Sequence, residues 1–384
     1  MAEAEGRVSE ARGRSGEASS SSSSSSYRCV WSSEGEDRSK GIVCSVSASV
    51  DGRYVFTGAS DKTLRVWQVL PATCASRLRC LQTIRDAHQD WIRCVAVSPG
   101  GGHVFTGSRD ETIRVWRINP GGGGGTAEPI LELAGILKGH NDWVRSLVTV
   151  DADDSILFSV SDDCTIREWD LTPFSKGSKR EDDDGVVSSS AQGSDGVILV
   201  DRCMIKRTSP KGIKSLAICP HREFIYIGFT DYTVRCMDIN GSDVRKAFKG
   251  HTGIVTSMQI STTVDSPGHH LLFTGSDDHT VRQWCTGSAV CLKVFSGHSG
   301  WIRDIKVWSR KLFSCSEDNK IFVWSLDPAD DHRSAPPPHE QWVTSHLTLE
   351  GHTAAVWQLA ITPDCRLLVS SSADGRIKAW GIGP

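Results

Sequence analysis

The sequence lacks any long apolar segment. No run of about 18 apolar residues occurs among its 384 residues, and this excludes a membrane-spanning helix. The opening stretch MAEAEGRVSEARGRSGEASS carries acidic residues and no apolar run, so it does not form a signal peptide. We therefore expect an intracellular protein, cytoplasmic or nuclear.

An excess of one charge and the motifs of metal or catalytic sites are also missing. The formal net charge is only -3, which disfavours nucleic acid as a partner. Thirteen cysteines occur without a CxxC, so we expect reduced, mostly buried thiols and no metal site. HExxH, a phosphate-binding glycine loop and a nucleophile elbow are absent, which argues against an enzyme and a cofactor.

What the sequence does contain is one string written several times. Thirteen tryptophans against four tyrosines first indicate a Trp-bearing repeat. The copies read FTGASDKTLRVW, FTGSRDETIRVW, FSVSDDCTIREW, FTGSDDHTVRQW, FSCSEDNKIFVW and VSSSADGRIKAW, and a weaker one, YIGFTDYTVRCM, ends at Met237. Each predicts a hairpin of two short strands around a polar turn. Further alternating runs lie before and after most copies, so each unit predicts four strands.

These strings resemble the WD-repeat (tryptophan-aspartate repeat) family over roughly residues 40 to 380. The resemblance implies an all-β fold: a seven-bladed β-propeller with four antiparallel strands per blade. In that family a His, a Ser or Thr, the turn Asp and the strand-ending Trp form a hydrogen-bond chain inside each blade. Five repeats here supply complete sets: His88, Thr106, Asp110 and Trp116; His140, Ser159, Asp163 and Trp169; His251, Thr274, Asp278 and Trp284; His298, Ser314, Asp318 and Trp324; His352, Ser370, Asp374 and Trp380.

Two repeats depart from this pattern. The first has Ser39 where the His belongs, and the fourth keeps Asp231 but has Ile227 and Met237 in place of the hydroxyl and the Trp. Because the Trp N–H donor and its hydroxyl and imidazole partners are lost together, no buried polar group is left without a partner. We expect a fourth blade that is weaker and more mobile than the others.

The His, Ser or Thr and Asp of each complete set are the residue types of a catalytic triad. A triad needs one exposed nucleophile and an oxyanion hole, whereas here the arrangement recurs in blade after blade with a Trp on the hydroxyl. We interpret the sets as structural. An enzyme that uses the central channel of the propeller is the alternative from a different functional class.

The last strand pattern ends at Trp380, which leaves the seventh blade without an outermost strand. We expect the segment Tyr27 to Trp31 to supply it and close the ring, because open sheet edges are a liability. The domain prediction is a disordered serine-rich tail at 1–26 and a propeller at 27–384 with a disordered insertion near 176–196. This insertion, Gly121 to Gly125 and the stretch from Asp327 all follow a third strand, so they leave one face open.

On that open face we expect partner contacts at three positions per repeat: the third and fifth residues after the His, and the residue before the turn Asp. Trp beside Arg is typical of binding hot spots, and mixed charges favour a peptide partner. Packing of these tryptophans between blades is the alternative. The expected contact residues are Trp91, Arg93, Arg109, Trp143, Arg145, Asp162, Trp301, Arg303, Glu317 and Trp357.

The sequence thus predicts a non-catalytic scaffold or adaptor that binds protein or peptide partners within a multiprotein complex. An alternative is a substrate receptor of a cullin-type ubiquitin ligase, which often carries WDxR after the third strand. The strand ends WQV, WRI, WDL, WCT and WSL do not supply that motif.

Overall fold

The computed structural model describes residues 27–71, 73, 77–119, 130–149, 155–174, 198–200, 203–207, 212–219, 223–239, 244–261, 270–326, 341–344 and 346–382. The stretches predicted to be disordered, 1–26 and 176–196, lie outside the described residues. The glycine run at 121–125 and the segment 327–340 lie outside them too.

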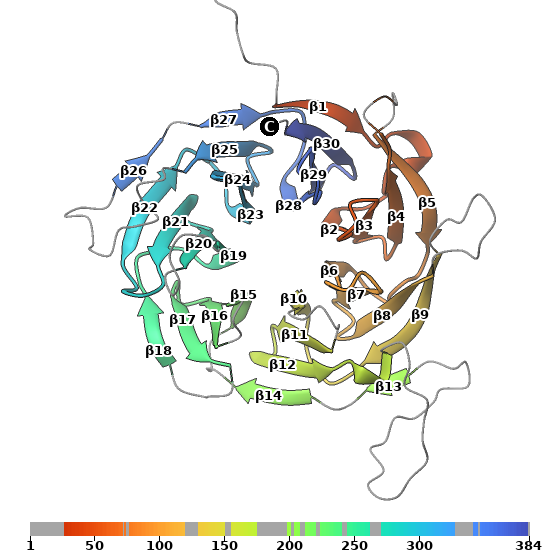
Figure 1. Ribbon diagram of the computed structural model, residues 1–384, viewed down its shortest axis with the longest axis horizontal. Coiled ribbons are helices and arrows are strands. Elements are labelled where there is room, and N and C mark those ends of the chain that lie inside the picture. Colours follow the sequence, from red (N-terminus) through yellow and green to blue (C-terminus); the bar gives the residue numbers. More distant parts are fainter. Residues whose placement is uncertain are drawn as a thin grey trace, which may run out of the picture.

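The described strands form seven sheets arranged as blades around a common centre (Figure 1). Within the first six blades the four main strands follow chain order from the innermost to the outermost, and neighbouring strands pair antiparallel. The first four blades are β2 (Val43–Ala48), β3 (Tyr54–Ala59), β4 (Leu64–Val69) and β5 (Leu78–Ile84); β6 (Ile92–Val97), β7 (His103–Ser108), β8 (Ile113–Asn119) and β9 (Ile130–Leu137); β10 (Val144–Thr149), β11 (Ile156–Ser161), β12 (Thr165–Asp170) and β14 (Cys203–Arg207); β15 (Ile213–Ile218), β16 (Phe224–Phe229), β17 (Val234–Asp238) and β18 (Val244–Phe248).

The fifth and sixth blades continue the same order, and in the seventh the outermost strand is the first described strand of the chain. Only two short 3-10 helices, η1 (Gly35–Asp37) and η2 (Thr172–Phe174), accompany the strands in the described part of the chain. The three blades are β19 (Val255–Ser261), β20 (Leu271–Ser276), β21 (Thr280–Cys285) and β22 (Cys291–Ser296); β23 (Ile302–Trp308), β24 (Lys311–Ser316), β25 (Ile321–Ser325) and β27 (Leu347–Leu349); β28 (Val356–Ile361), β29 (Leu367–Ser372), β30 (Ile377–Ile382) and β1 (Tyr27–Ser32). The predicted seven-bladed propeller is confirmed.

Strand β1 closes the ring, as the strand count predicted. It pairs antiparallel with β30, with Tyr27 opposite Ile382 and Trp31 opposite Ala379. Just beyond the strand, the Ser33 amide donates to the carbonyl of Ile377 at 3.0 Å, and the Ile377 amide donates to Ser33 Oγ at 3.0 Å. The first and last described strands therefore share one blade, which leaves no unpaired edge on β30.

Two blades carry a fifth strand that the sequence did not predict. Strand β13 (Ile198–Val200) pairs parallel with β9, and β26 (Gln341–Val343) pairs parallel with β22. Each belongs to the connection between the third and fourth strands of the following blade, and each lies on the outer rim (Figure 1). A polar connection thus reaches back to cover the exposed edge of the preceding blade.

The hydrophobic core lies between the blades. Apolar residues of neighbouring blades form shared buried clusters, for example Phe158 and Ile166 of the third blade with Ile213 and Ile225 of the fourth. Close approach requires glycine in some second strands: a Cβ on Gly107 would lie 2.7 Å from Val144 Cγ1 of the next blade. The blades therefore stack face to face, and the inner strands converge on the centre.

Candidate partner-binding site

The five complete repeat sets form the hydrogen-bond chain that the family resemblance implies. In the fifth blade, Trp284 Nε1 donates to Thr274 Oγ1 at 2.8 Å, and that hydroxyl lies 2.7 Å from His251 Nε2. His251 Nδ1 lies 2.7 Å from Asp278 Oδ2. The carboxylate can only accept, so Nδ1 carries the proton and Nε2 accepts from the hydroxyl. The other four sets repeat these contacts at 2.6 to 3.0 Å.

The turn Asp of each set has a second role. In the second blade, Asp110 Oδ1 accepts from the Thr112 amide at 3.0 Å, and the residue between them, Glu111, has a φ of 68°. Hydrogen bonds from His88 and Thr112 outweigh burial and hold the pKa of Asp110 well below its usual range. One carboxylate thus fixes the hairpin turn and the imidazole together.

Four imidazoles of these sets are held in the neutral form. Burial lowers their pKa below the ordinary 6.5, although the paired Asp acts in the opposite direction. We call these four the tetrad histidines: His88, His140, His251 and His352. A neutral imidazole between a hydroxyl and a carboxylate satisfies its two nitrogens and needs no further partner.

The two incomplete repeats replace the missing groups differently. In the first blade the Ser39 hydroxyl donates to Asp61 Oδ2 at 2.5 Å, which preserves the contact to the turn carboxylate. In the fourth blade Arg235 Nη2 lies 2.7 Å from Asp231 Oδ2 and takes the place of the imidazole. Ile227 of that blade is fully buried. The lower stability expected of the fourth blade stays a prediction.

The inner strand of every blade carries a β-bulge after its first residue. In β6, for example, Ile92 pairs with Ser108 and Cys94 with Gly107, so Arg93 has no partner in the ladder. A bulged residue is free to turn its side chain away from the sheet. We call the seven bulged residues the bulge ring: Cys44, Arg93, Arg145, Lys214, Thr256, Arg303 and Trp357.

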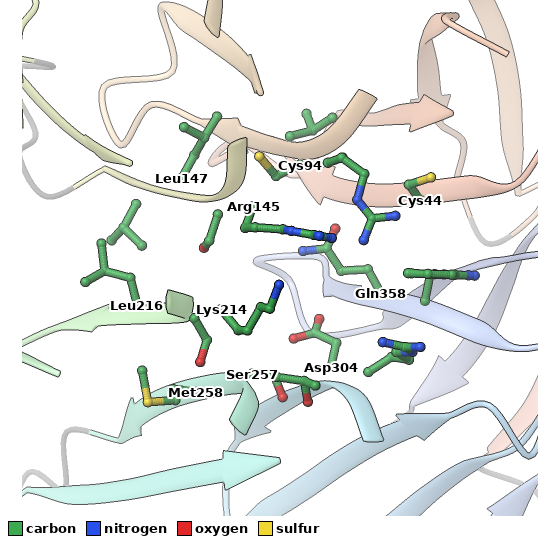
Figure 2. A pocket seen from close by; sticks show the side chains of 18 of the residues that line it. Cys44, Cys94, Arg145, Leu147, Lys214, Leu216, Ser257, Met258, Asp304 and Gln358 are labelled. Atoms are coloured by element: carbon green, nitrogen blue, oxygen red, sulfur yellow. The ribbon is translucent and has the colours of Figure 1, made fainter. Parts of the chain in front are cut away.

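The bulge ring lines a central cavity of about 270 Å³. Figure 2 shows Arg145 and Lys214 reaching into this space from β10 and β15, with Asp304 of β23 facing them. Four of the seven ring residues are among the expected contact residues. The convergence of these side chains defines the mouth of the channel.

The remaining expected residues lie around that mouth. Each of three tryptophans precedes an inner strand, and its carbonyl accepts a backbone hydrogen bond from the residue before the turn Asp: Trp91 from Arg109 at 2.9 Å, Trp143 from Asp162 and Trp301 from Glu317, both at 3.0 Å. Trp301 is 45% exposed, and the other two are half-buried. The structure therefore brings all ten expected contact residues to one end of the blades.

Guanidinium groups lie against the indole rings of this face. Arg109 lies 5.6 Å from the ring centroid of Trp91 and 4.0 Å from that of Trp143, so it joins the second blade to the third. Arg145 lies 4.6 Å from the same Trp143 ring. Across the mouth, Trp357 has Arg93 at 4.9 Å and Arg303 at 4.7 Å. The indoles thus pack against cations rather than only against apolar core.

Acidic residues pair with most of these cations. Asp162 accepts from Arg145 Nε at 2.8 Å and from Lys214 Nζ at 2.7 Å. Glu317 accepts from Arg303 Nε at 3.0 Å. Sequence reasoning missed Lys214, because the fourth repeat lacks the His from which the positions were counted. The string GIKSL, which aligns with WIRCV and WVRSL, carries the signal that would have found it.

The described residues also bear on metal binding and membrane insertion. Within the described ranges no three His, Cys, Asp or Glu residues are grouped to hold a metal ion, and no helix there has the length and apolar content of a membrane span. Eleven of the described cysteines carry thiols rather than disulfide bonds, and most of these are buried.

The family profile described as "WD domain, G-beta repeat" matches residues 27–68, 78–117, 131–170, 242–285, 289–325 and 339–381. The chain belongs to this WD-repeat family. The matched segments leave out the three inner strands of the fourth blade, β15 to β17, in keeping with its missing hydroxyl and Trp. A solved structure, described as the WD40 β-propeller domain of Doa1, superposes on 93% of this chain and 97% of its own with a TM-score of 0.65 and 16% identity, and shows the same fold.

Similarity to curated proteins is confined to parts of each chain. A probable E3 ubiquitin ligase complex SCF subunit sconB of Aspergillus clavatus is 58% identical over 36 residues, 9% of this chain and 5% of its own length. Human striatin-4 is 40% identical over 67 residues, which are 17% of this chain and 8% of its own length. Mouse kinesin-like protein KIF21B is 26% identical over 257 residues, which are 64% of this chain and 14% of its own length. The chain therefore spans only a small part of these relatives.

Proposed function

We propose that this WD-repeat propeller is a non-catalytic scaffold or adaptor that binds protein or peptide partners at the mouth of its channel. The observation that carries the proposal is the gathering of four tryptophans and four arginines on one face, with Trp301 left 45% exposed. Large amphipathic rings beside guanidinium groups are the composition of binding hot spots. Membership of a multiprotein complex is part of the proposal.

The environment of the repeat hydroxyls supports a non-catalytic role. The five Ser and Thr hydroxyls of the complete sets belong to residues with no exposed surface, and each already accepts from a Trp. A nucleophile must reach its substrate. The His, hydroxyl and Asp sets therefore act as internal struts of the blades.

The test compares two tryptophans at opposite ends of one strand. Trp301 precedes β23 and Trp308 ends it, and their exposed fractions are 45% and 46%. We expect Trp301→Ala in the full-length chain to weaken recovery of partners, identified by affinity purification and mass spectrometry, while Trp308→Ala leaves recovery unchanged. Loss of one such anchor costs about 2 kcal/mol of binding, about 30-fold.

Two further variants separate binding from folding. Trp143→Ala and Arg145→Ala change the other side of the mouth, and both should reduce partner recovery with little change in melting temperature. A fall in melting temperature by many degrees for Trp143→Ala would assign that ring to the core between blades. Equal recovery by Trp301→Ala and the unaltered chain would contradict the proposed site.

A second candidate function is substrate receptor of a cullin-type ubiquitin ligase. The short match to a protein named as an SCF subunit favours it. The third strands end without WDxR; the third blade, for example, reads Trp169, Asp170, Leu171 and Thr172. Recovery of a cullin with the chain, lost on mutation at the rim rather than at the mouth, would favour this function over a scaffold.

A further inference from the structure

The cations of the bulge ring are unequally paired. Arg145 and Lys214 share Asp162, and Arg303 has Glu317. Arg93 has no carboxylate within ion-pair distance among the described residues. It is the one ring cation in that part of the chain whose charge the protein does not balance.

The surroundings of Arg93 leave hydrogen-bond donors without acceptors. Its guanidinium lies 4.9 Å from the ring centroid of Trp357, and its Nε is buried without a hydrogen-bond partner. The Nε1 of Trp357 is likewise buried and without a partner. Both groups can only donate. Arg93 Nε and Trp357 Nε1 thus present N–H groups for which no described residue provides an acceptor, while the Cys44 thiol interacts with the same guanidinium.

The charge of Arg93 persists in this setting. Burial lowers the pKa of Arg93, and repulsion from Arg145 and Arg303 acts in the same direction, while Cys44 and Cys94 oppose it. A guanidinium nevertheless stays protonated at neutral pH, because its ordinary pKa lies far above it. An unbalanced charge on a half-buried side chain is costly, so an incoming anion gains more here than at a cation that is already paired.

The opposite side of the mouth has the reverse character. Asp277, in the turn of the fifth blade, has a buried Oδ1 without a partner. Burial raises the pKa of Asp277, and Glu317 adds to this effect while Arg303 opposes it. Another negative charge is therefore disfavoured beside the fifth blade. An anion is therefore favoured beside Arg93 of the second blade and Trp357 of the seventh rather than beside Asp277.

We propose that the channel mouth receives one carboxylate side chain, an Asp or Glu of an extended partner segment, bound by Arg93 and the indole N–H of Trp357. The inference rests on the proposed function and names the chemistry of the partner. A cavity of about 270 Å³ has room for a side chain and none for a folded element. A planar guanidinium fork matches the two oxygens of a carboxylate.

The probe is a randomised twelve-residue peptide library displayed on phage and panned against the full-length chain. We expect the selected peptides to share one Asp or Glu position. In a synthetic labelled peptide, changing that residue to Gln or Asn should weaken binding about 10- to 100-fold, as loss of a charge-assisted hydrogen bond does. This half of the test leaves the protein unaltered.

The protein half uses Arg93→Met, which keeps an apolar stem and removes the charge, and Arg93→Lys, which keeps the charge without the fork. Arg93→Met should weaken the acidic peptide by the same factor and leave the amide-substituted peptide unaffected, whereas Arg93→Lys retains part of the affinity. Arg117→Met is the matched control, because Arg117 is an exposed arginine of the same blade. Its binding should equal that of the unaltered chain.

Selected peptides without a shared acidic position, or equal binding of the acidic and amide peptides, would overturn the inference. If Trp301→Ala still abolishes binding of those peptides, the proposed function survives and only the carboxylate is wrong. Binding of a single-stranded RNA dodecamer that Arg93→Met weakens, together with no selected acidic peptide, would assign the mouth to another class of ligand.

Discussion

Replacing Thr274 by Val tests the hydrogen-bond chain at its centre. Valine keeps the branched shape and removes the hydroxyl that accepts from Trp284 at 2.8 Å and lies 2.7 Å from His251 Nε2. Thr274 has no exposed surface and Trp284 is 1% exposed, so water cannot replace the lost partner. The substitution strands two buried polar atoms.

The expected magnitude follows from that count. Each stranded group costs about 1–3 kcal/mol, so Thr274→Val should lower the free energy of unfolding by about 2–6 kcal/mol. The assay is urea unfolding followed by circular dichroism. The matched control is Thr252→Val, whose exposed side chain lies in the same blade and whose loss should cost under about 0.5 kcal/mol.

A second substitution, at Trp284, tests whether the indole and the hydroxyl are energetically coupled. Trp284→Phe removes the stranded N–H, so the double variant should lose less stability than the sum of the two single variants. The fourth blade already has Ile227 and Met237 at these two positions, with no polar atom left behind. Two results would refute the structural role of the hydrogen-bond chain. The first is that Thr274→Val lowers the free energy of unfolding no more than Thr252→Val does. The second is that the double variant loses the exact sum of the stability lost by the two single variants.

Three more predictions concern stability. The tetrad histidines have pKa values below the ordinary 6.5, so as the pH falls the unfolded chain takes up protons before the folded chain does. The stability present above pH 6.5 should therefore decrease on acidification. A higher urea midpoint at pH 5.5 than at pH 7.5 would contradict this. Deleting residues 1–26 should leave the midpoint unchanged while deleting 1–34 lowers it severely, because β1 is lost; similar midpoints would speak against closure. Glu111→Gly should stabilise by about 0.5 kcal/mol by relieving a positive φ, measured against Glu132→Gly in a strand, which should destabilise.

The repeat and the closure could be predicted because each leaves a local mark in the sequence. Seven strings with a turn Asp specify seven hairpins, and counting strands after Trp380 shows that one is missing. The segment that supplies the missing strand, Tyr27 to Trp31, lies just before the first repeat in the sequence.

The bulge ring and the fifth strands could not be predicted in the same way. Alternation along a strand placed Arg93 and Arg145 at the mouth, but a bulge arises from backbone pairing with the second strand and has no signature in side-chain polarity. Strands β13 and β26 are three residues each and pair parallel with a different blade. Such contacts depend on the finished fold, because they join segments far apart in the chain.

The bulges also separate recognition from folding. A bulged residue contributes no ladder pair, so its side chain can change without altering the backbone ladder of its blade. The seven positions already hold Cys, Arg, Lys, Thr and Trp on nearly identical backbones. The channel mouth is therefore a set of seven positions whose side chains can vary while the strand pairing of each blade stays as it is, and neighbouring positions that share a contact, such as Arg145 and Lys214 on Asp162, set the binding preference together.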